Sequence, residues 1–270
     1  MRKLDSRFIF GAFVLGIMLS LIVGGLLFLS PEEVSLTNRL CPPSGAHLFG
    51  CDLNGGDVFY AILHGGKISL SLSIITVLIT LFVGVNIGLL TGYIGGLTDR
   101  IIMMFIDILM AFPGILLSLL VSSLMPASYI TLIFAMTLTG WIGFARITRA
   151  LVLSFKEREH VLSAIAIGQH PLQILRLHIF PMLIAPLLVQ FTFSLSGVII
   201  VESSLSFLGL GPQNGFLSWG GLLSQGKTVM LSAPWLTLIP GTFIMLTVMS
   251  FNFIGDFLRD YYDPRVSRSR

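Results

Sequence analysis

Charged residues are what this sequence lacks most. Only 11% of its 270 residues are Asp, Glu, Lys or Arg, whereas 54% are hydrophobic. A soluble domain is about one-quarter charged, and a mean hydropathy of +0.93 leaves too little polar surface to cover a core in water. The composition excludes an ordinary soluble protein. It predicts an all-α membrane protein, because the bilayer is the natural solvent for such a chain.

Clusters of basic residues are also missing. The net charge is +3, but the Lys and Arg residues stand singly between apolar stretches. They form no patch of the kind that nucleic acid requires. We therefore expect membrane lipid around this chain and no nucleic acid among its partners.

Patterns typical of catalysis and metal binding are absent too. The sequence has no H-E-x-x-H, no G-x-S-G and no pair of intramembrane aspartates. Its five histidines are never four residues apart and none lies in the middle of a predicted span; they are His47, His64, His160, His170 and His178. We expect no enzymatic activity, no metal site and no cofactor on this chain.

One apparent nucleotide motif has the wrong context. Residues 221–228 match the phosphate-binding pattern G-x-x-x-x-G-K-[ST]. A functional P-loop follows a buried strand and opens a helix, so that its amides surround phosphate. This stretch lies instead in a predicted loop between two apolar spans. We interpret the match as coincidental, with Lys227 as a loop charge near the membrane surface.

Long apolar runs are abundant, and six are long enough to cross a bilayer as helices. They are 8–29, 68–95, 101–125, 129–152, 181–202 and 234–258. The first follows a basic start but has about 22 residues, which is longer than the core of a signal peptide, so we expect it to be retained. Pro113 and Gly114 predict a kink in the third span.

The basic residues orient this bundle. With the N-terminus inside, all but three of the sixteen Lys and Arg residues fall in inside segments, the exceptions being Arg39, Lys67 and Lys227. Positive residues favour the cytoplasmic side. Both termini are therefore predicted to be cytoplasmic.

Small residues recur along one face of the second span. Gly84, Gly88, Gly92 and Gly96 are four residues apart, and small residues at this spacing let membrane helices approach closely. The partner is either another helix of this chain or a helix of a second subunit.

Polar residues inside the predicted spans are few. Asp107 is the only acid that we place well inside a span, and we expect it to pair with Arg100 or Arg146 or to have a functional role. Without a histidine or lysine partner it does not indicate a proton relay. The hydroxyl and amide side chains either line a path or bond between helices. They are Thr76, Thr80, Asn86, Thr137, Thr139, Thr192, Ser194, Ser196, Thr242, Thr247 and Asn252.

Cysteine is scarce as well. Cys41 and Cys51 both fall in the outside segment that precedes the second span. The space outside a bacterial inner membrane is oxidising. We predict a disulfide between them, the alternative being two unpaired thiols.

The inside segment 153–180 is the most informative part of the chain. A helix is predicted from about residue 156, ending at Gly168, and Pro171 suits the first turn of a second, partly apolar helix. Pro181 is predicted to end that helix and begin the next span. Apolar surface on such an element requires either a protein partner or contact with the lipid surface.

The stretch from Glu159 to Gly168, followed by Pro181, resembles the EAA loop of ABC importer permeases. Ala164, Gly168 and Pro181 match the family pattern, whereas Leu162 and Ser163 replace its leading Glu-Ala pair and His178 replaces an isoleucine. The resemblance implies that this loop docks on an ATPase subunit. We expect the coupling residues to be Glu159, Ala164, Gly168, Pro171 and Pro181.

Further stretches resemble the dipeptide, oligopeptide and nickel branch of that family, in order along nearly the whole chain. They are FGCDLNGGDVF at 49–59, Asp99, Asp107, Phe112 and Pro113 around the third span, WIGFAR at 141–146, SFLGLG at 206–211, and Asn252, Gly255, Asp256, Leu258, Arg259, Asp260, Asp263 and Pro264 near the C-terminus. A single stretch is weak, but the ordered set is specific.

The resemblance implies a permease bundle of the type I ABC importer kind in the bacterial inner membrane. Residues 1–67 would form an N-terminal helix with an extracytoplasmic segment, and 68–270 a five-helix core. The implied partners are a second permease, two ATP-binding subunits that hold ATP and Mg²⁺, and an extracytoplasmic binding protein that delivers peptides or nickel chelates. Residues 203–233 would meet that protein or gate the outer mouth. The alternative is a stand-alone secondary carrier or channel, which would need inverted repeats or coupling charges that we do not find.

Overall fold

The computed structural model describes residues 6–28, 35–212 and 217–262. These parts are helical apart from connecting loops and one isolated β-bridge, between Cys51 and Asp57. The predicted all-α fold is confirmed. The elements are α1 Ser6–Phe28, η1 Leu36–Asn38, α2 Val58–Ile94, α3 Gly96–Met110, α4 Gly114–Leu124, α5 Tyr129–Lys156, α6 Glu159–Ala166, α7 Pro171–Gln173, η2 Ile174–Ile179, α8 Phe180–Phe207, α9 Trp219–Gly226, η3 Lys227–Val229 and α10 Trp235–Tyr262.

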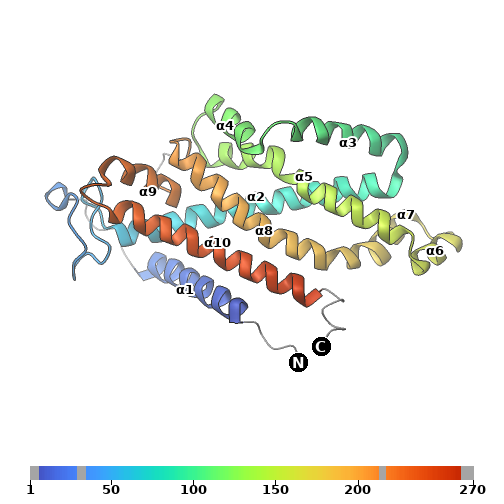
Figure 1. The fold of residues 1–270 in the computed structure, drawn as a ribbon, viewed down its shortest axis with the longest axis horizontal. Helices are drawn as coiled ribbons and strands as arrows, with labels where there is room; N and C mark the ends of the chain where they lie inside the picture. Colours follow the sequence, from blue (N-terminus) through green and yellow to red (C-terminus); the bar gives the residue numbers. More distant parts are fainter. Residues whose placement is uncertain (1–5, 29–34, 213–216, 263–270) are drawn as a thin grey trace.

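The long helices lie side by side along the long axis of the molecule (Figure 1). The short helices α6 and α7 lie at one extremity, which we call the α6 end. Helix α9 and the loop that precedes α2 lie at the opposite extremity, which we call the α9 end (Figure 1). Helices α2, α5 and α8 run between the two ends, and α10 runs from the α9 end beside α1 and α8.

Five helices in the described residues are long and apolar enough to cross a membrane, and a sixth span results if the bent pair α3 and α4 is counted as one. The two helices of that pair meet at 78°. The break falls at the predicted position: α3 ends at Met110 and α4 begins at Gly114, directly after Pro113. Proline disfavours helical backbone in the residue before it and donates no backbone hydrogen bond, so the helix stops here.

Helix α2 begins at Val58, earlier than the span predicted from residue 68. The Asp57 carboxylate caps it by accepting from the backbone N–H of Phe59 at 2.6 Å and of Tyr60 at 3.2 Å. Polar residues in the first turns lower the hydropathy there without interrupting the helix. Hydropathy alone therefore placed the start of this span too late along the chain, because it does not register the cap at Asp57.

The small face of α2 packs on α5 of the same chain. A Cβ atom at Gly84 would lie 2.4 Å from the Trp141 carbonyl oxygen. One at Gly88 would lie 2.6 Å from the Thr148 Cβ, and Gly92 is similarly close to Val152. Only glycine permits such an approach of the two backbones, so these three residues serve packing within the chain rather than with a second subunit.

Gly96 does not belong to that packing face, contrary to the prediction. Its surroundings are open, and its φ of +62° follows a φ of +68° at Gly95. The two residues form the turn between α2 and α3, where a left-handed backbone favours glycine. The four-residue spacing of the glycines therefore extends past Ile94, the last residue of α2.

Candidate coupling segment and the opposite end

Residues 157–179, which we call the coupling segment, follow α5 at the α6 end. Helix α6 begins with Glu159, whose carboxylate is exposed at the positive end of the helix dipole. Gly168, with φ of +77°, ends it. Its backbone N–H donates to the Ile165 carbonyl at 3.0 Å, and that of Gln169 donates to the Ala164 carbonyl at 3.1 Å. The local chemistry is that of a glycine C-cap, as the sequence indicates.

Pro171 begins α7, again as predicted, but Pro181 does not end it. The chain continues from α7 through the π-helical η2 into α8, and Pro171–Phe207 forms one unbroken apolar helix. In η2 the Phe180 N–H donates to the Leu175 carbonyl, five residues back. This wider turn accommodates the missing N–H of Pro181 without a break. The coupling segment is therefore joined rigidly to α8.

One face of the coupling segment is buried in the bundle. Val161, Ala164 and Ile174 pack in a core cluster with Val152 and Phe155 of α5. Ala164 is one of the predicted coupling residues, and here it anchors α6 rather than facing outward. The small side chain lets α6 lie close to its neighbours.

The exposed side of the segment carries apolar side chains, together with polar ones such as His160 and Arg176. Ile167 is 82% exposed and Leu172 68%. Further exposed apolar residues on this face are Leu162, Ile165 and Leu177. Glu159, Gly168, Pro171 and Pro181 are exposed beside them. An apolar patch of this kind, held on a firm anchor, is typical of a protein interaction site.

Two charged contacts fix the helices that carry the coupling segment. Arg149 of α5 donates to both carboxylate oxygens of Asp99 in α3, at 2.5 Å and 2.6 Å. Lys156 donates to the Tyr93 carbonyl of α2 at 2.9 Å. These bonds hold α2, α3 and α5 together at the α6 end. The paired arrangement of arginine and carboxylate gives the contact a defined geometry.

Asp107 also has a partner. Its carboxylate lies 3.6 Å from the Arg146 guanidinium, which confirms one of the two predicted pairings. Both side chains are exposed on the bundle surface. The pair is an ordinary ion pair rather than a proton-relay site.

The polar side chains of the spans mostly bond their own helices. Thr80, Thr192 and Thr247 donate to backbone carbonyls three or four residues earlier. Ser196 of α8 donates to the Val248 carbonyl of α10 at 3.3 Å, which is a bond between helices. These hydroxyl groups therefore bond helix backbone carbonyls, which favours a role in the packing of the helices over one in lining a translocation path.

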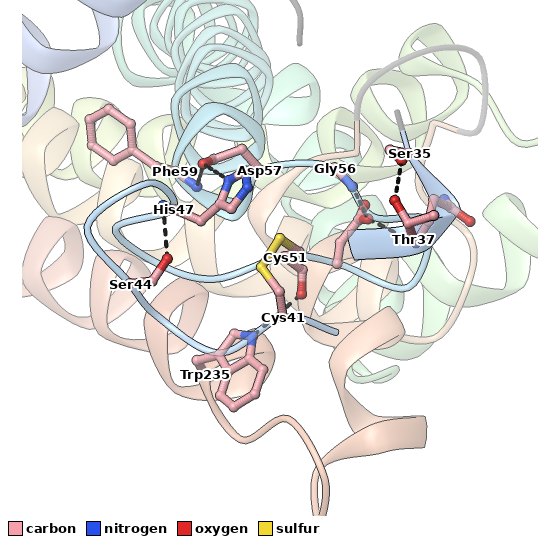
Figure 2. The surroundings of a disulfide bond; sticks show 12 residues. Ser35, Thr37, Cys41, Ser44, His47, Cys51, Gly56, Asp57, Phe59 and Trp235 are labelled. Atoms are coloured by element: carbon pink, nitrogen blue, oxygen red, sulfur yellow. Dashed lines mark hydrogen bonds and ion pairs between the residues drawn. A yellow bond between two sulfur atoms is a disulfide. The ribbon is translucent and has the colours of Figure 1, made fainter. Parts of the chain in front are cut away.

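A disulfide joins Cys41 and Cys51 in the loop at the α9 end (Figure 2). Trp235, at the start of α10, donates from its indole N–H to the Cys51 carbonyl at 3.4 Å. His47 bonds Asp57 at 2.9 Å, on the far side of the loop. The loop is thus fixed both to α10 and to the cap of α2. Both sulfurs are used in the disulfide, so the cluster of the two cysteines and His47 offers no thiolate ligand.

A buried carboxylate lies at the same end. Glu202, near the end of α8, is fully buried. It accepts hydrogen bonds from Ser69 of α2 at 3.0 Å and from Ser206, one turn further along α8, at 2.8 Å. Ser203 at 3.4 Å and Ser218 bond it as well. We call Glu202 with these four serines the serine–glutamate joint.

The joint corrects one prediction, since Asp107 is not the only acid inside the bundle. Glu202 fell on the last residue of the predicted fifth span, and α8 continues to Phe207. Ser206 four residues after Glu202, on the same helix face, is a signal that could have indicated a satisfied buried acid. Ser69 gave no such signal because it lies 133 residues away in sequence.

The segment predicted as an outer loop contains the buried helix α9. Ser218 caps it by accepting from the Gly221 N–H at 3.3 Å. Trp219 is fully buried and donates from its indole N–H to the Ile62 carbonyl of α2 at 2.9 Å. The residues of the apparent phosphate motif begin inside this helix rather than in a loop after a strand. Their glycines allow close contact with neighbouring helices, as at Gly226, which approaches the backbone of Leu236.

The chain is similar to known transport proteins over most of its length. A family model described as "Binding-protein-dependent transport system inner membrane component" matches residues 84–268. The "Dipeptide transport system permease protein DppC" of Bacillus subtilis (strain 168) is 41% identical over 245 residues, which cover 89% of this chain and 77% of that protein.

Two further relatives give the same picture. The "Oligopeptide transport system permease protein OppC" of Bacillus subtilis (strain 168) is 38% identical, over 88% of this chain and 78% of that protein. The "Glutathione transport system permease protein GsiD" of Pectobacterium atrosepticum is 40% identical, over 83% of this chain and 74% of that protein. With the apolar helices described above, these similarities show that the chain is a multi-pass permease component of the family of binding-protein-dependent transport system inner membrane components.

Proposed function

We propose that this chain forms half of the translocation pathway of an ATP-driven importer and receives the ATPase stroke through the coupling segment. The proposal rests on the exposed apolar side chains of α6 and α7, in a chain that belongs to a family of transport-system membrane components. Ile167 and Leu172 would insert into a groove on the ATP-binding subunit. Burial of such side chains contributes about 1.5–3 kcal/mol each.

The same element would pass the motion on. Because α7, η2 and α8 form one helix, a displacement of the docked segment moves α8 without an intervening hinge loop. The partner subunits would hold ATP and Mg²⁺, and this chain would hydrolyse nothing. No cofactor on this chain is needed for that role.

The orientation follows from charge. Basic residues at the α6 end include Arg149, Lys156, Arg158 and Arg176. We propose that this end is cytoplasmic, where an ATPase can reach it. The α9 end would then face the binding protein, and the oxidising compartment there suits the Cys41–Cys51 disulfide.

A second permease would cover the groove between α2 and α8. This groove has a volume of about 680 Å³ and is lined almost wholly by apolar residues, including Phe82 of α2 and Phe191 of α8. We propose a heterodimer across this face. The division of the chain into an N-terminal part, residues 1–67, and a five-helix core, residues 68–270, stays a prediction. The cargo would be a small peptide, since the relatives are named for dipeptide, oligopeptide and glutathione transport.

Site-specific photo-crosslinking tests the coupling role. A photoreactive amino acid at Ile167 should crosslink to the ATP-binding subunit in the co-expressed complex. The matched control is Leu231, a fully exposed apolar residue at the α9 end, which should give no such product. An assembled complex in which Ile167 never crosslinks to the ATPase would rule out the proposed docking. A chain that purifies without ATPases would favour a stand-alone carrier or channel.

A further inference from the structure

The serine–glutamate joint takes no part in the proposed docking. Burying its carboxylate nevertheless costs free energy. Removing a carboxylate from water costs several kcal/mol unless hydrogen bonds compensate. Here hydroxyl groups supply the compensation, and within the described residues the structure gives Glu202 no ion-pair partner. Acids inside a membrane bundle are expensive, so one that is retained usually has a function.

The donors come from three different elements. Ser69 belongs to α2, Ser203 and Ser206 to α8, and Ser218 is the N-cap of α9. A carboxylate has two oxygens with about four acceptor sites, which suits this number of hydroxyls. Glu202 thus connects the ends of α2, α8 and α9 through side chains that are themselves buried.

A second set of bonds extends the joint into α9. The Trp219 backbone N–H donates to the Ser69 hydroxyl at 3.2 Å, and this hydroxyl in turn donates to Glu202. The backbone of Gly220 lies so close to Ser203 that a Cβ would be 2.4 Å from its carbonyl oxygen. Helix α9 therefore cannot slide along α8 without breaking several buried contacts at once.

Helix α8 connects this joint to the coupling segment. The unbroken helix Pro171–Phe207 carries the coupling segment at one end and Glu202 at the other. Figure 1 shows α8 running between the α6 end and the α9 end. Any displacement of α8 as a body reaches the joint.

We propose that Glu202 is a positioning residue for transport: the joint makes α9 and the adjoining end of α2 move together with α8. ATP-driven displacement of the coupling segment then changes the α9 end. This inference rests on the proposed function, because it requires an ATPase that moves α8. Without Glu202, ATP hydrolysis continues but the movement no longer reaches α9.

A cavity beside the joint offers a readout. It has a volume of about 260 Å³, borders α9 and is lined by Ser206, Ser218, Ser224 and Gln225 among others. A cysteine placed at Ser224 reports on this cavity. The two natural cysteines are joined in a disulfide, so on this chain the new thiol alone reacts with a membrane-impermeant maleimide, and labelling is read on this chain after the subunits are separated.

The experiment uses the complete transporter in proteoliposomes with the Ser224→Cys change, at rest and trapped with ATP and vanadate. We measure labelling rate, peptide uptake and ATP hydrolysis in parallel. The coupling free energies of allosteric systems correspond to factors of about 5 to 150. We therefore expect the parent labelling rate to change at least about fivefold on trapping.

Glu202→Ala should abolish that change and lower uptake about tenfold, while ATP hydrolysis stays within about twofold. Glu202→Gln should restore part of both, because its amide can still bond several of the serines. Ser204→Ala is the matched control: its exposed hydroxyl bonds the Ile200 carbonyl at 2.7 Å and takes no part in the joint. It should behave as the parent.

Parent-like labelling and uptake in Glu202→Ala would overturn the proposal, as would a parent whose labelling never changes. Equal losses of ATP hydrolysis and uptake would show a merely structural role and would also contradict it. If Glu202→Ala fails to assemble, Ser69→Ala decides, since it removes one bond between α2 and the joint. Absence of ATPases from the parent complex would instead refute the proposed function, which keeps the two failures distinguishable.

Discussion

The α6 end and the α9 end of this molecule differ in how their side chains are buried. At the α6 end, apolar side chains such as Ile167 and Leu172 point away from the bundle and contact little of their own chain. At the α9 end, Trp219, Cys51 and Glu202 are fully buried, and their polar atoms are bonded within the chain. We interpret the first end as a surface for a partner subunit, whereas the second holds a buried polar network, although Leu231 is exposed there as well. Changes at the first should therefore affect assembly, and changes at the second should affect stability or, at Glu202, the coupled movement.

The largest effect on assembly should follow from Gly168→Asp in the coupling segment. The aspartate places a charge beside an apolar docking face and occupies a left-handed backbone position. Loss of an interface hot spot of about 2 kcal/mol corresponds to about 30-fold weaker association. We expect at least this loss in ATPase binding, measured by co-purification and titration, with normal membrane insertion.

Gly95→Asp is the control for that change. Gly95 also has a positive φ, +68°, with ψ of −154°, and it has open surroundings at the same end but outside the coupling segment. Its effect on ATPase binding should stay within about threefold, as for a surface change of about 0.5 kcal/mol. Equal losses in both variants would show that strain, and not docking, explains the defect.

Trp219→Ala should cause the largest loss of stability at the α9 end. It empties a fully buried site and leaves the Ile62 carbonyl without its indole donor. Removal of a buried tryptophan side chain costs about 3–5 kcal/mol. Thermal unfolding in detergent should show it, with Trp141→Ala as the comparison, since that partly buried indole bonds only its own helix. Similar losses in the two variants would refute the distinction.

Breaking the disulfide should have a smaller effect. It joins Cys41 and Cys51 across a sequence separation of 10, for which loop-closure entropy gives about 2–3 kcal/mol. Reduction, or the double change to serine, should lower the unfolding temperature and leave ATPase binding unchanged. Two reactive thiols in the unreduced protein would contradict the structure directly.

The Asp99–Arg149 pair should contribute least. The two side chains are partly exposed, so we expect about 1–2 kcal/mol, between the values for exposed and buried pairs. A double-mutant cycle with Asp99→Ala and Arg149→Ala measures the coupling free energy. Additive losses would mean that the two residues stabilise the α6 end independently.

The sequence predicted those features that depend on local chemistry. Gly168 ends α6, Pro171 begins α7, and the chain breaks beside Pro113, because each residue restricts its own backbone. The continuation of α7 into α8 was missed, since a π-helical turn cannot be recognised from a proline alone.

The features that depend on distant partners could not be predicted. Nothing in the sequence around Glu202 indicates that Ser69 and Ser218 approach it, and hydropathy alone does not show that α9 is buried. The glycine spacing predicted a packing face correctly for Gly84, Gly88 and Gly92. It failed at Gly96 because the helix ends at Ile94.

The intact mass of the detergent-solubilised complex, after co-expression with a second permease and ATP-binding subunits, decides whether this chain works in an ATP-driven importer. We expect one particle that contains this chain, the second permease and two ATPases, and its ATPases should be lost in Gly168→Asp. A chain that repeatedly purifies alone, or only with itself, would contradict it.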